Sequence, residues 1–236
     1  KSLLGAFREE LSFELDQFQI DGCEAIERGH GVLVAAPTSA GKTIVGQFAV
    51  YLALAKQSRC FYTTPIKALS NQKFNEFVEV FGQEQVGLLT GDNSINGDAP
   101  VVVMTTEVLR NMLYENARDL ADLSHVVMDE VHYLADRSRG AVWEEVIIHL
   151  PSHVRVVALS ATVSNAEEFG EWIATVRGET DVVVEEIRPT PLHQMVMVGH
   201  ELYELFSDGS KAKVNPELMR FARNEQSNSR HRGRNV

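Results

Sequence analysis

Residues 36–43, with the sequence APTSAGKT, combine a small-residue turn, a cation and a hydroxyl in an order that suits phosphate binding. A short apolar run with a β-branched core precedes them, and an apolar segment without proline follows. We therefore expect a strand, a tight turn and a helix. In that setting the N–H groups of the turn and the positive end of the helix face one point, where phosphate oxygens bind well. The segment predicts a nucleotide site.

Two side chains of this segment have predicted roles of their own. Lys42 would reach the β- and γ-phosphates, and the hydroxyl of Thr43 would be a ligand of Mg²⁺. The usual pattern begins with glycine where this chain has Ala36, and a methyl group fits there if φ stays negative. An ordinary glycine turn before a helix is the alternative for the motif taken alone. The residues predicted to bind the nucleotide are Pro37, Thr38, Ser39, Ala40, Gly41, Lys42 and Thr43.

Asp129 and Glu130 directly follow the apolar run 125–128. Ligands of parallel sheets bind beyond the carboxyl ends of the strands, so this pair is expected near the phosphate loop. Asp129 is predicted to hold Mg²⁺, usually through water, and Glu130 to orient and deprotonate the attacking water. An Asp-Glu pair also begins many ordinary loops, but its combination with Lys42 favours catalysis. Lys42, Asp129 and Glu130 are the candidate catalytic residues.

A second hydroxyl motif, SAT, ends the expected strand 155–159. The hydroxyls of Ser160 and Thr162 could bond to the carboxylates or to the ring of His132, and we take these three as candidate coupling residues. Thr162 could equally cap the helix that follows.

Strands and helices alternate between residues 29 and 184. Continuous apolar strands interleaved with helices predict an α/β domain whose mostly parallel sheet has helices on both faces. The expected strands are 32–36, 59–63, 86–89, 101–104, 125–128, 155–159 and 181–184, and the expected helices are 43–56, 67–81, 106–115, 142–150 and 165–176.

Composition limits the class of protein. A chain of 236 residues with 44% hydrophobic content can bury a full core, which fits one α/β domain with appendages. The longest apolar stretch, 45–55, is too short to span a bilayer and no signal peptide opens the chain, so we expect no membrane partner. Two cysteines are too few for a disulfide framework. We expect a cytoplasmic location, or a nuclear one in a eukaryote.

Charge is distributed unevenly along the chain. The formal net charge is −11, yet residues 211–236 carry seven Lys or Arg against two Glu and are net +5. From Ser207 onward polar residues dominate, and we expect this tail to be mobile and incompletely folded. A basic tail could contact nucleic acid, but a solvated linker is the favoured interpretation.

Five motifs, APTSAGKT, TTPIKALSNQK, TTEVLR, DEVH and SAT, resemble those of a superfamily 2 helicase in order and spacing. The stretch DEVHYLADRSRGAVWEEVIIHLP, residues 129–151, is similar to the superkiller branch of DExH-box RNA helicases, which are cofactors of the RNA-degrading exosome. The resemblance covers residues 13 to about 192 and implies the first of two RecA-like (P-loop NTPase) motor domains. It divides the chain into a lead-in (1–12), the RecA-like domain (13–190) and a connecting strand with the basic tail (191–236).

The resemblance also implies residue roles. Gln19, in FELDQFQ, falls on the family's adenine-reading glutamine, with a surface helix residue as the alternative. Segments after three strands are implied to follow the nucleic-acid backbone, with turn or helix-cap roles as the alternative. The implied nucleic-acid residues are Thr64, Pro65, Lys67, Gly91, Thr105, Thr106 and Glu107.

The resemblance implies an ATP-dependent RNA helicase that uses ATP and Mg²⁺ on single-stranded or partly duplex RNA, with RNA-degradation machinery as a possible partner. A motor that grips sugar and phosphate needs no large basic face, so the acidic charge is no objection. The alternatives are a DNA helicase of the same superfamily and a nucleotide-dependent binding module. The chain begins at Lys1 and no second RecA-like module follows Val198. We therefore expect a fragment that is nearly inactive without that domain in cis and its arginine finger.

Overall fold

The computed structural model describes residues 2–115, 120–131, 140–162, 164–188, 194–207 and 213–223. The chain divides into two compact units, Lys1–Arg188 and Pro189–Val236. Every candidate site residue of the sequence lies in the first unit.

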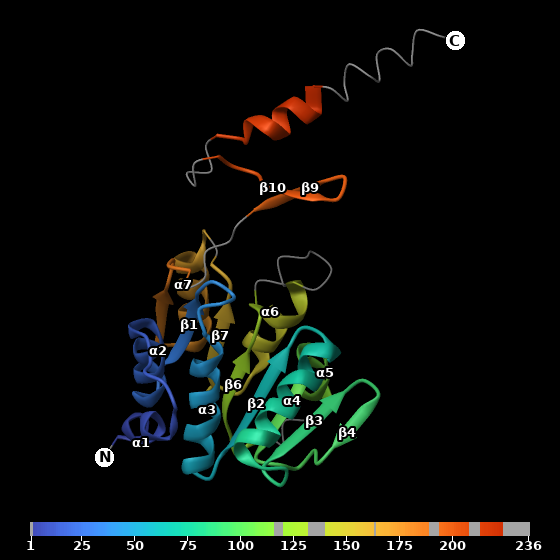
Figure 1. Cartoon of the computed structure of the whole chain (residues 1–236). Helices are drawn as coiled ribbons and strands as arrows, with labels where there is room; N and C mark the ends of the chain where they lie inside the picture. The colour runs from blue at the N-terminus through green and yellow to red at the C-terminus, as the bar shows by residue number, and fades with distance from the viewer. Residues whose placement is uncertain are drawn as a thin grey trace. The chain divides into compact units, whose positions relative to one another are not determined.

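An eight-stranded sheet forms the centre of the first unit (Figure 1). Its strand order is β4-β3-β5-β2-β6-β7-β1-β8, and all neighbours are parallel except β3 and β4, which are antiparallel. The predicted fold class, a mostly parallel sheet, is confirmed. The strands are β1 (Gly31–Ala35), β2 (Arg59–Thr64), β3 (Val86–Thr90), β4 (Asn93–Ile95), β5 (Val101–Thr105), β6 (Leu123–Met128), β7 (Arg155–Ser160) and β8 (Thr180–Val184).

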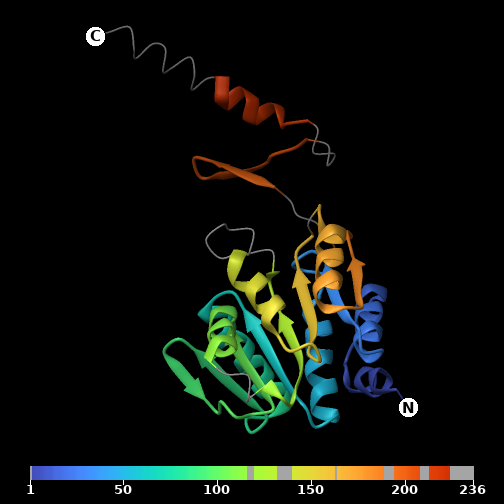
Figure 2. The ribbon, with the colours of Figure 1, turned by 180° about the vertical axis from the view of Figure 1, so that it is seen from behind.

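Alternate strand residues pack against two layers of helices, because successive side chains of a strand point to opposite faces. Val32 and Val34 of β1 belong to the core on one face, and Leu33 belongs to the core on the other. Figures 1 and 2 show these helices on either side of the sheet. The first core includes side chains of α1 (Leu3–Glu10), α2 (Gln17–Glu27), α3 (Thr43–Ala55) and α4 (Lys67–Phe81), and the second those of α5 (Thr106–Glu115), α6 (Gly140–His149) and α7 (Ala166–Arg177).

Three elements of this unit were not predicted from the sequence. The strand β4 has three exposed residues, so it shows no buried pattern. The helix α2 lies before the first expected strand, and α1 occupies the lead-in 1–12. Leu4 and Phe7 of α1 are buried, and the ring of Phe7 lies 5.3 Å from that of Phe48 on α3. The lead-in therefore contributes to the first core.

His125 of β6 is buried in the same strand that leads to Asp129. Burial lowers the pKa of its imidazole to about 4, and the charges of Lys56 and Arg155 act in the same direction. Its Nδ1 lies 2.8 Å from the hydroxyl oxygen of Ser124. The folded protein therefore holds a neutral imidazole at a position where water cannot stabilise the charged form.

The second unit contains a hairpin of β9 (Met195–Val198) and β10 (Glu201–Glu204) and a helix over residues 216–223. The tail was expected to be incompletely folded, and for 216–223 this expectation is wrong. Asn215 caps the helix, since its Oδ1 accepts from the N–H of Glu217 at 3.0 Å. The ring of Phe221 lies 5.3 Å from that of Tyr203 in the hairpin. Residues 208–212 and 224–236 of the tail lie outside the described residues.

Among the described residues, no helix is long and apolar enough to cross a membrane.

Candidate functional site

The predicted phosphate loop connects β1 to α3. Within the described residues, Gln57, Asn96 and Glu130 are the non-glycine residues with positive φ, so Ala36 keeps the backbone that its methyl group requires. The Ala36 N–H donates to the carbonyl of Ser160 at 3.0 Å, which joins the start of the loop to the end of β7. Gly41 has a φ of +82°, a conformation that favours glycine.

Gln19 of α2 is part of the same loop structure. Its Nε2 donates to the carbonyl of Gly41 at 3.0 Å, and its Oε1 accepts from the N–H of Asp16 at 2.8 Å. Gln19 is buried, so its interpretation as a surface helix residue is wrong. A Cβ on Gly41 would lie 2.8 Å from the Gln19 amide nitrogen. The backbone conformation therefore favours glycine at position 41, and a larger residue there would displace the end of the Gln19 side chain.

Lys42 and the Asp129–Glu130 pair come together beyond the carboxyl ends of the strands. The Nζ of Lys42 lies 3.7 Å from Oε1 of Glu130, and the Lys42 side chain is only 3% exposed. Since β7 lies between β1 and β6, this contact crosses the end of one intervening strand. Glu130 has a φ of +56°, a left-handed conformation that costs a non-glycine residue on the order of 1–3 kcal/mol and is found mostly at functional sites.

Both carboxylate oxygens of Asp129 have hydrogen-bond donors. Its Oδ1 accepts from the N–H of Glu130 at 2.8 Å, and its Oδ2 accepts from the hydroxyl of Tyr62 at 2.6 Å. Burial, and then the charge of Asp129, raise the pKa of Tyr62 well above its usual value. The hydroxyl therefore keeps its proton and is the donor of this bond.

Tyr62 is not among the site residues predicted from the sequence. An aromatic residue inside an apolar strand reads as core, and no spacing signal connects it to Asp129. The pairing of β2 with β6 makes the connection, because it places Tyr62 opposite Val127 and Thr63 opposite Met128.

The donor set at this position fits a hard cation. Thr43 and Asp129 offer oxygen ligands, which Mg²⁺ prefers, and the carboxylate of Asp129 is held in one orientation. In the described part of the chain, no three His, Cys, Asp or Glu side chains form a metal site by themselves. That agrees with an ion held jointly by one or two protein groups and the phosphates of a nucleotide.

The three candidate coupling residues either have other contacts, are exposed or lie outside the described residues. The hydroxyl of Ser160 donates to the carbonyl of Ala161 at 2.9 Å, and Thr162 is exposed. The alternative interpretation of Thr162 as a helix cap is wrong, because the N-cap of α7 is Asn165. His132 lies outside the described residues.

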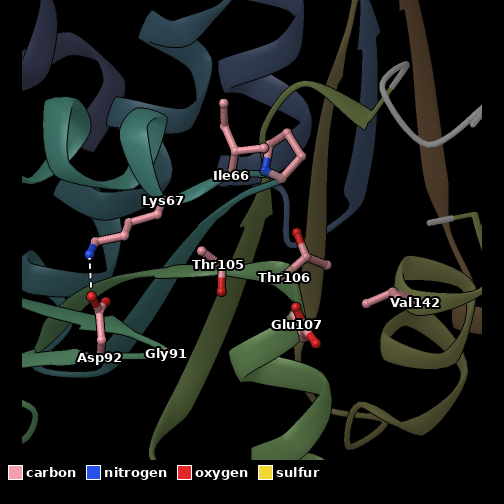
Figure 3. Close-up of a pocket in the computed structure, with 9 residues that line it drawn as sticks. Ile66, Lys67, Gly91, Asp92, Thr105, Thr106, Glu107 and Val142 are labelled. Atoms are coloured by element: carbon pink, nitrogen blue, oxygen red, sulfur yellow. Dashed lines mark hydrogen bonds and ion pairs between the residues drawn. The ribbon is translucent and has the colours of Figure 1, made fainter. Parts of the chain in front are cut away.

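A pocket of about 500 Å³ gathers the predicted nucleic-acid residues at the same edge of the sheet. Figure 3 shows Lys67 and Asp92 on one side of it and Val142 of α6 on the other, with Thr105, Thr106 and Glu107 between them. Ile66 and Asp92 belong to the segments predicted to follow the nucleic acid, whereas Val142 was not predicted and comes from a helix that carries no motif of the nucleic-acid track. The lining residues are Pro65, Ile66, Lys67, Gly91, Asp92, Thr105, Thr106, Glu107 and Val142.

Two helices begin at this pocket, α4 at Lys67 and α5 at Thr106. The positive ends of two helices favour a phosphate there. The Nζ of Lys67 lies 2.5 Å from Oδ2 of Asp92, and this hydrogen bond is the main reason why the pKa of Asp92 is lowered. In the protein alone, the predicted phosphate-binding lysine is thus paired with a carboxylate.

The threonines near the pocket differ from one another. Thr64 is buried, and its hydroxyl contacts the carbonyl of Ile66 at 2.9 Å and Oγ of Ser70 at 2.7 Å, so it shapes the turn into α4 from behind. Thr106 donates to the carbonyl of Thr64 at 3.3 Å. Thr105 accepts from the N–H of Val108 at 3.4 Å, which is the geometry of a helix cap.

A comparison with models of known protein families shows the family of this chain. Residues 16–169, more than half of the chain, match the model described as "DEAD/DEAH box helicase". The chain is a member of the DEAD/DEAH box helicase family. The resemblance stated from the motifs is confirmed.

Several curated helicases are similar over most of this chain. The probable helicase HelY of Mycobacterium leprae is 64% identical over 220 residues, which are 92% of this chain and 24% of that protein. The chloroplastic DExH-box ATP-dependent RNA helicase DExH15 of Arabidopsis thaliana is 50% identical over 87% of this chain and 18% of its own length. The antiviral helicase SKI2 of Saccharomyces cerevisiae is 47% identical over 84% of this chain and 16% of its own length. The chain thus spans a quarter or less of these relatives.

Solved helicase structures share the fold. The DUF1998 helicase MrfA has a TM-score of 0.60 at 21% identity, covering 77% of this chain and 32% of that one. The UvsW helicase of bacteriophage T4 has a TM-score of 0.58 at 19% identity, covering 77% of this chain and 66% of that one. At such identities the likeness shows the fold alone, and the RecA-like helicase architecture expected from the motifs is confirmed.

Proposed function

We propose that this domain binds and hydrolyses ATP with Mg²⁺ as one half of an RNA helicase motor. One observation carries the proposal: the phosphate loop, the Asp129–Glu130 pair and the 500 Å³ pocket follow the carboxyl ends of strands in one sheet. A shared, largely buried sheet would connect these places, so that a movement at one of them could affect the others.

The nucleotide half uses groups already in place. Membership of the family implies that the domain uses a nucleotide, and the loop around Gly41 would hold its phosphates, with Lys42 on the β- and γ-phosphates and Gln19 on adenine. Thr43 and, through water, Asp129 would hold Mg²⁺, which neutralises charge on the phosphates when bound. Glu130, 3.7 Å from Lys42, would orient the attacking water and take its proton.

The nucleic-acid half would bind backbone and not bases. α4 and α5 begin at residues that line the pocket, so the N–H groups of their first turns would be available to a phosphate there, and Lys67 supplies a positive charge. Such contacts fix the strand without reading its sequence. They also suit an acidic chain, since they require a few directed donors and no broad basic surface.

RNA is the proposed substrate because of the relatives. DExH15 is named an RNA helicase, and the human Superkiller complex protein 2 is 48% identical over 80% of this chain. We propose an RNA-degradation assembly as the partner on the same ground, and a second RecA-like domain as the other wall of the nucleotide site. A DNA helicase is the second candidate, favoured by the fold shared with a DNA-bound structure of MrfA.

The test is the steady-state ATPase rate of the full-length protein with single-stranded RNA, and with DNA of the same sequence. We expect RNA to stimulate hydrolysis more than DNA does, and Lys42→Ala to abolish both responses. Stronger stimulation by DNA would favour the second candidate. Residues 1–236 alone should hydrolyse ATP negligibly with either polymer, because the facing domain supplies the remaining transition-state charge. Strong stimulated turnover by that piece would contradict the two-domain mechanism.

A further inference from the structure

Tyr62 is a fully buried tyrosine in the middle of the sheet. Its one polar side-chain atom donates to Oδ2 of Asp129 at 2.6 Å. If the hydroxyl had no function, phenylalanine could replace this tyrosine without loss of packing. Here the hydroxyl instead reaches the carboxylate on which the proposed metal site depends.

The ring of Tyr62 is held by the two helices that begin at the two sites. Its centroid lies 4.9 Å from that of Phe77 on α4, with the planes at 89°. A Cβ on Gly46 of α3 would lie 3.0 Å from Cε2 of Tyr62, so the helix that follows the phosphate loop leaves room for this ring. The position of the hydroxyl is therefore fixed by packing.

The two donors to Asp129 act on different oxygens. The N–H of Glu130 binds Oδ1 and the hydroxyl of Tyr62 binds Oδ2, so rotation of the carboxylate about its Cβ–Cγ bond would break both bonds. Each oxygen keeps lone pairs for a further contact. Without the hydroxyl, Oδ2 of a mostly buried carboxylate would lose this donor, and among the described residues the bond from Glu130 would be left to hold the orientation.

We propose that Tyr62 is a positioning residue that holds the Asp129 carboxylate in the orientation required for the Mg²⁺ of the nucleotide complex. The inference rests on the proposed function, since it presumes that Asp129 serves the metal. Partners that orient metal ligands typically change metal affinity by about 10- to 100-fold when they are removed. Because Asp129 acts through water, we expect the lower end of that range.

The experiment compares Tyr62→Phe with Tyr51→Phe in the full-length protein. Tyr51 lies on α3, and its hydroxyl donates to Glu10 at 3.3 Å near the surface, so its loss is the matched control. The measurement is the affinity for a fluorescent ATP analogue in Mg²⁺ and in EDTA. In Tyr62→Phe the gain in affinity from Mg²⁺ should fall by about tenfold, with the EDTA affinity unchanged. Tyr51→Phe should match the wild type in both conditions.

A thermal unfolding curve without nucleotide separates positioning from damage to the fold. If Tyr62→Phe lowers affinity equally in Mg²⁺ and EDTA, or leaves the Mg²⁺ gain intact, Tyr62 is a core residue and the inference is wrong. The double variant with Asp129→Asn gives a second reading: once Asp129 no longer serves the metal, Tyr62→Phe should add no further loss. Additive losses would also overturn the inference.

The single variant Asp129→Asn distinguishes the proposed metal role of Asp129 from the positioning role of Tyr62. If it keeps the full Mg²⁺ gain, the proposed metal role of Asp129 is wrong and the positioning role fails with it. If Asp129→Asn loses the gain while Tyr62→Phe keeps it, the metal role stands and the positioning role alone is wrong.

Discussion

Lys42 and Lys67 occupy equivalent places in two neighbouring regions of the domain. Each follows a strand of the sheet, lies at the start of a helix and faces a carboxylate. Their surroundings are opposite. The side chain of Lys42 is 3% exposed and lies 3.7 Å from Glu130, whereas the side chain of Lys67 is 49% exposed and contacts Asp92, which is 67% exposed.

The difference in exposure determines what each charge can do. Water and salt screen the Lys67–Asp92 pair, so the pair contributes little to stability, and in the proposed function a phosphate of a passing strand would replace Asp92. Little water surrounds Lys42, so its interaction with a phosphate is strong and its position is fixed. One lysine thus suits a reaction that requires precise placement, and the other suits a polymer that must be released. The predictions below test this contrast.

The largest effect is expected for Glu130→Gln in the full-length protein. Turnover should fall by about 10²- to 10⁴-fold, because the base and orienter of the water is lost, while ATP affinity changes little. Glu144→Gln is the matched control, since Glu144 is exposed on α6. Steady-state ATPase rates and calorimetry measure the two quantities. A loss below about tenfold would mean that Glu130 is not the base.

Burial should also control the charge state of side chains away from the two sites. His125 tests this expectation. Its folded pKa of about 4 lies below the ordinary 6.5, so between these values the unfolded chain binds the additional proton. The contribution of the neutral imidazole is therefore complete above pH 6.5 and is lost as the pH falls toward 4, by up to about 3 kcal/mol.

Urea unfolding at several pH values measures this loss. In His125→Gln the free energy of unfolding should depend less on pH in that window. His149→Gln, at an exposed position on α6, should keep the pH dependence of the wild type. An unchanged slope in His125→Gln would show that the buried imidazole is not the titrating group.

Lys42→Ala should weaken nucleotide binding by about 10- to 100-fold, because it removes a charge-assisted contact to the phosphates. Since Lys42 is buried, the loss should be nearly the same at 50 and 200 mM salt. Lys67→Ala serves as the control and should leave nucleotide affinity unchanged. Calorimetric titration with ATP distinguishes the outcomes, and an unaltered affinity in Lys42→Ala would mean that the loop does not bind phosphate as proposed.

The smallest effect is expected for Lys67→Ala on RNA binding. Affinity should fall a few-fold, and the slope of log K against log salt should decrease by about one, because one phosphate contact is lost. Asp92→Asn, which frees Lys67 from its partner, should change affinity in the opposite direction. Fluorescence anisotropy with single-stranded RNA measures both variants. Equal salt slopes in Lys67→Ala and wild type would exclude Lys67 from the phosphate track.

The predictable part of the fold is the part with a repeating pattern. The seven parallel strands and helices α3 to α7 follow from apolar runs of defined length, because burial on both sides of a strand or one side of a helix leaves a periodic signal. Two of the missed elements lack that signal. The strand β4 has three exposed residues, and the helix 216–223 depends on a cap at Asn215 and a ring contact of Phe221.

The sequence by itself determined the identity and order of the groups that do chemistry. Asp129 and Glu130 directly follow an apolar strand, and Lys42 and Thr43 follow another after a short loop, so their spacing from a strand end can be read along the chain. The six predicted residues that line the pocket were found for the same reason.

The tertiary structure alone decided how these groups are held. The bond from Tyr62 to Asp129 and the contact of Gln19 with Gly41 join residues 67 and 22 positions apart, and Val142 lines the same pocket as Pro65 and Glu107. No local pattern encodes such contacts, because they depend on strand register and on which helix covers which face. The left-handed backbone of Glu130 belongs with them, since a conformation unfavourable to glutamate persists only when the packed surroundings impose it.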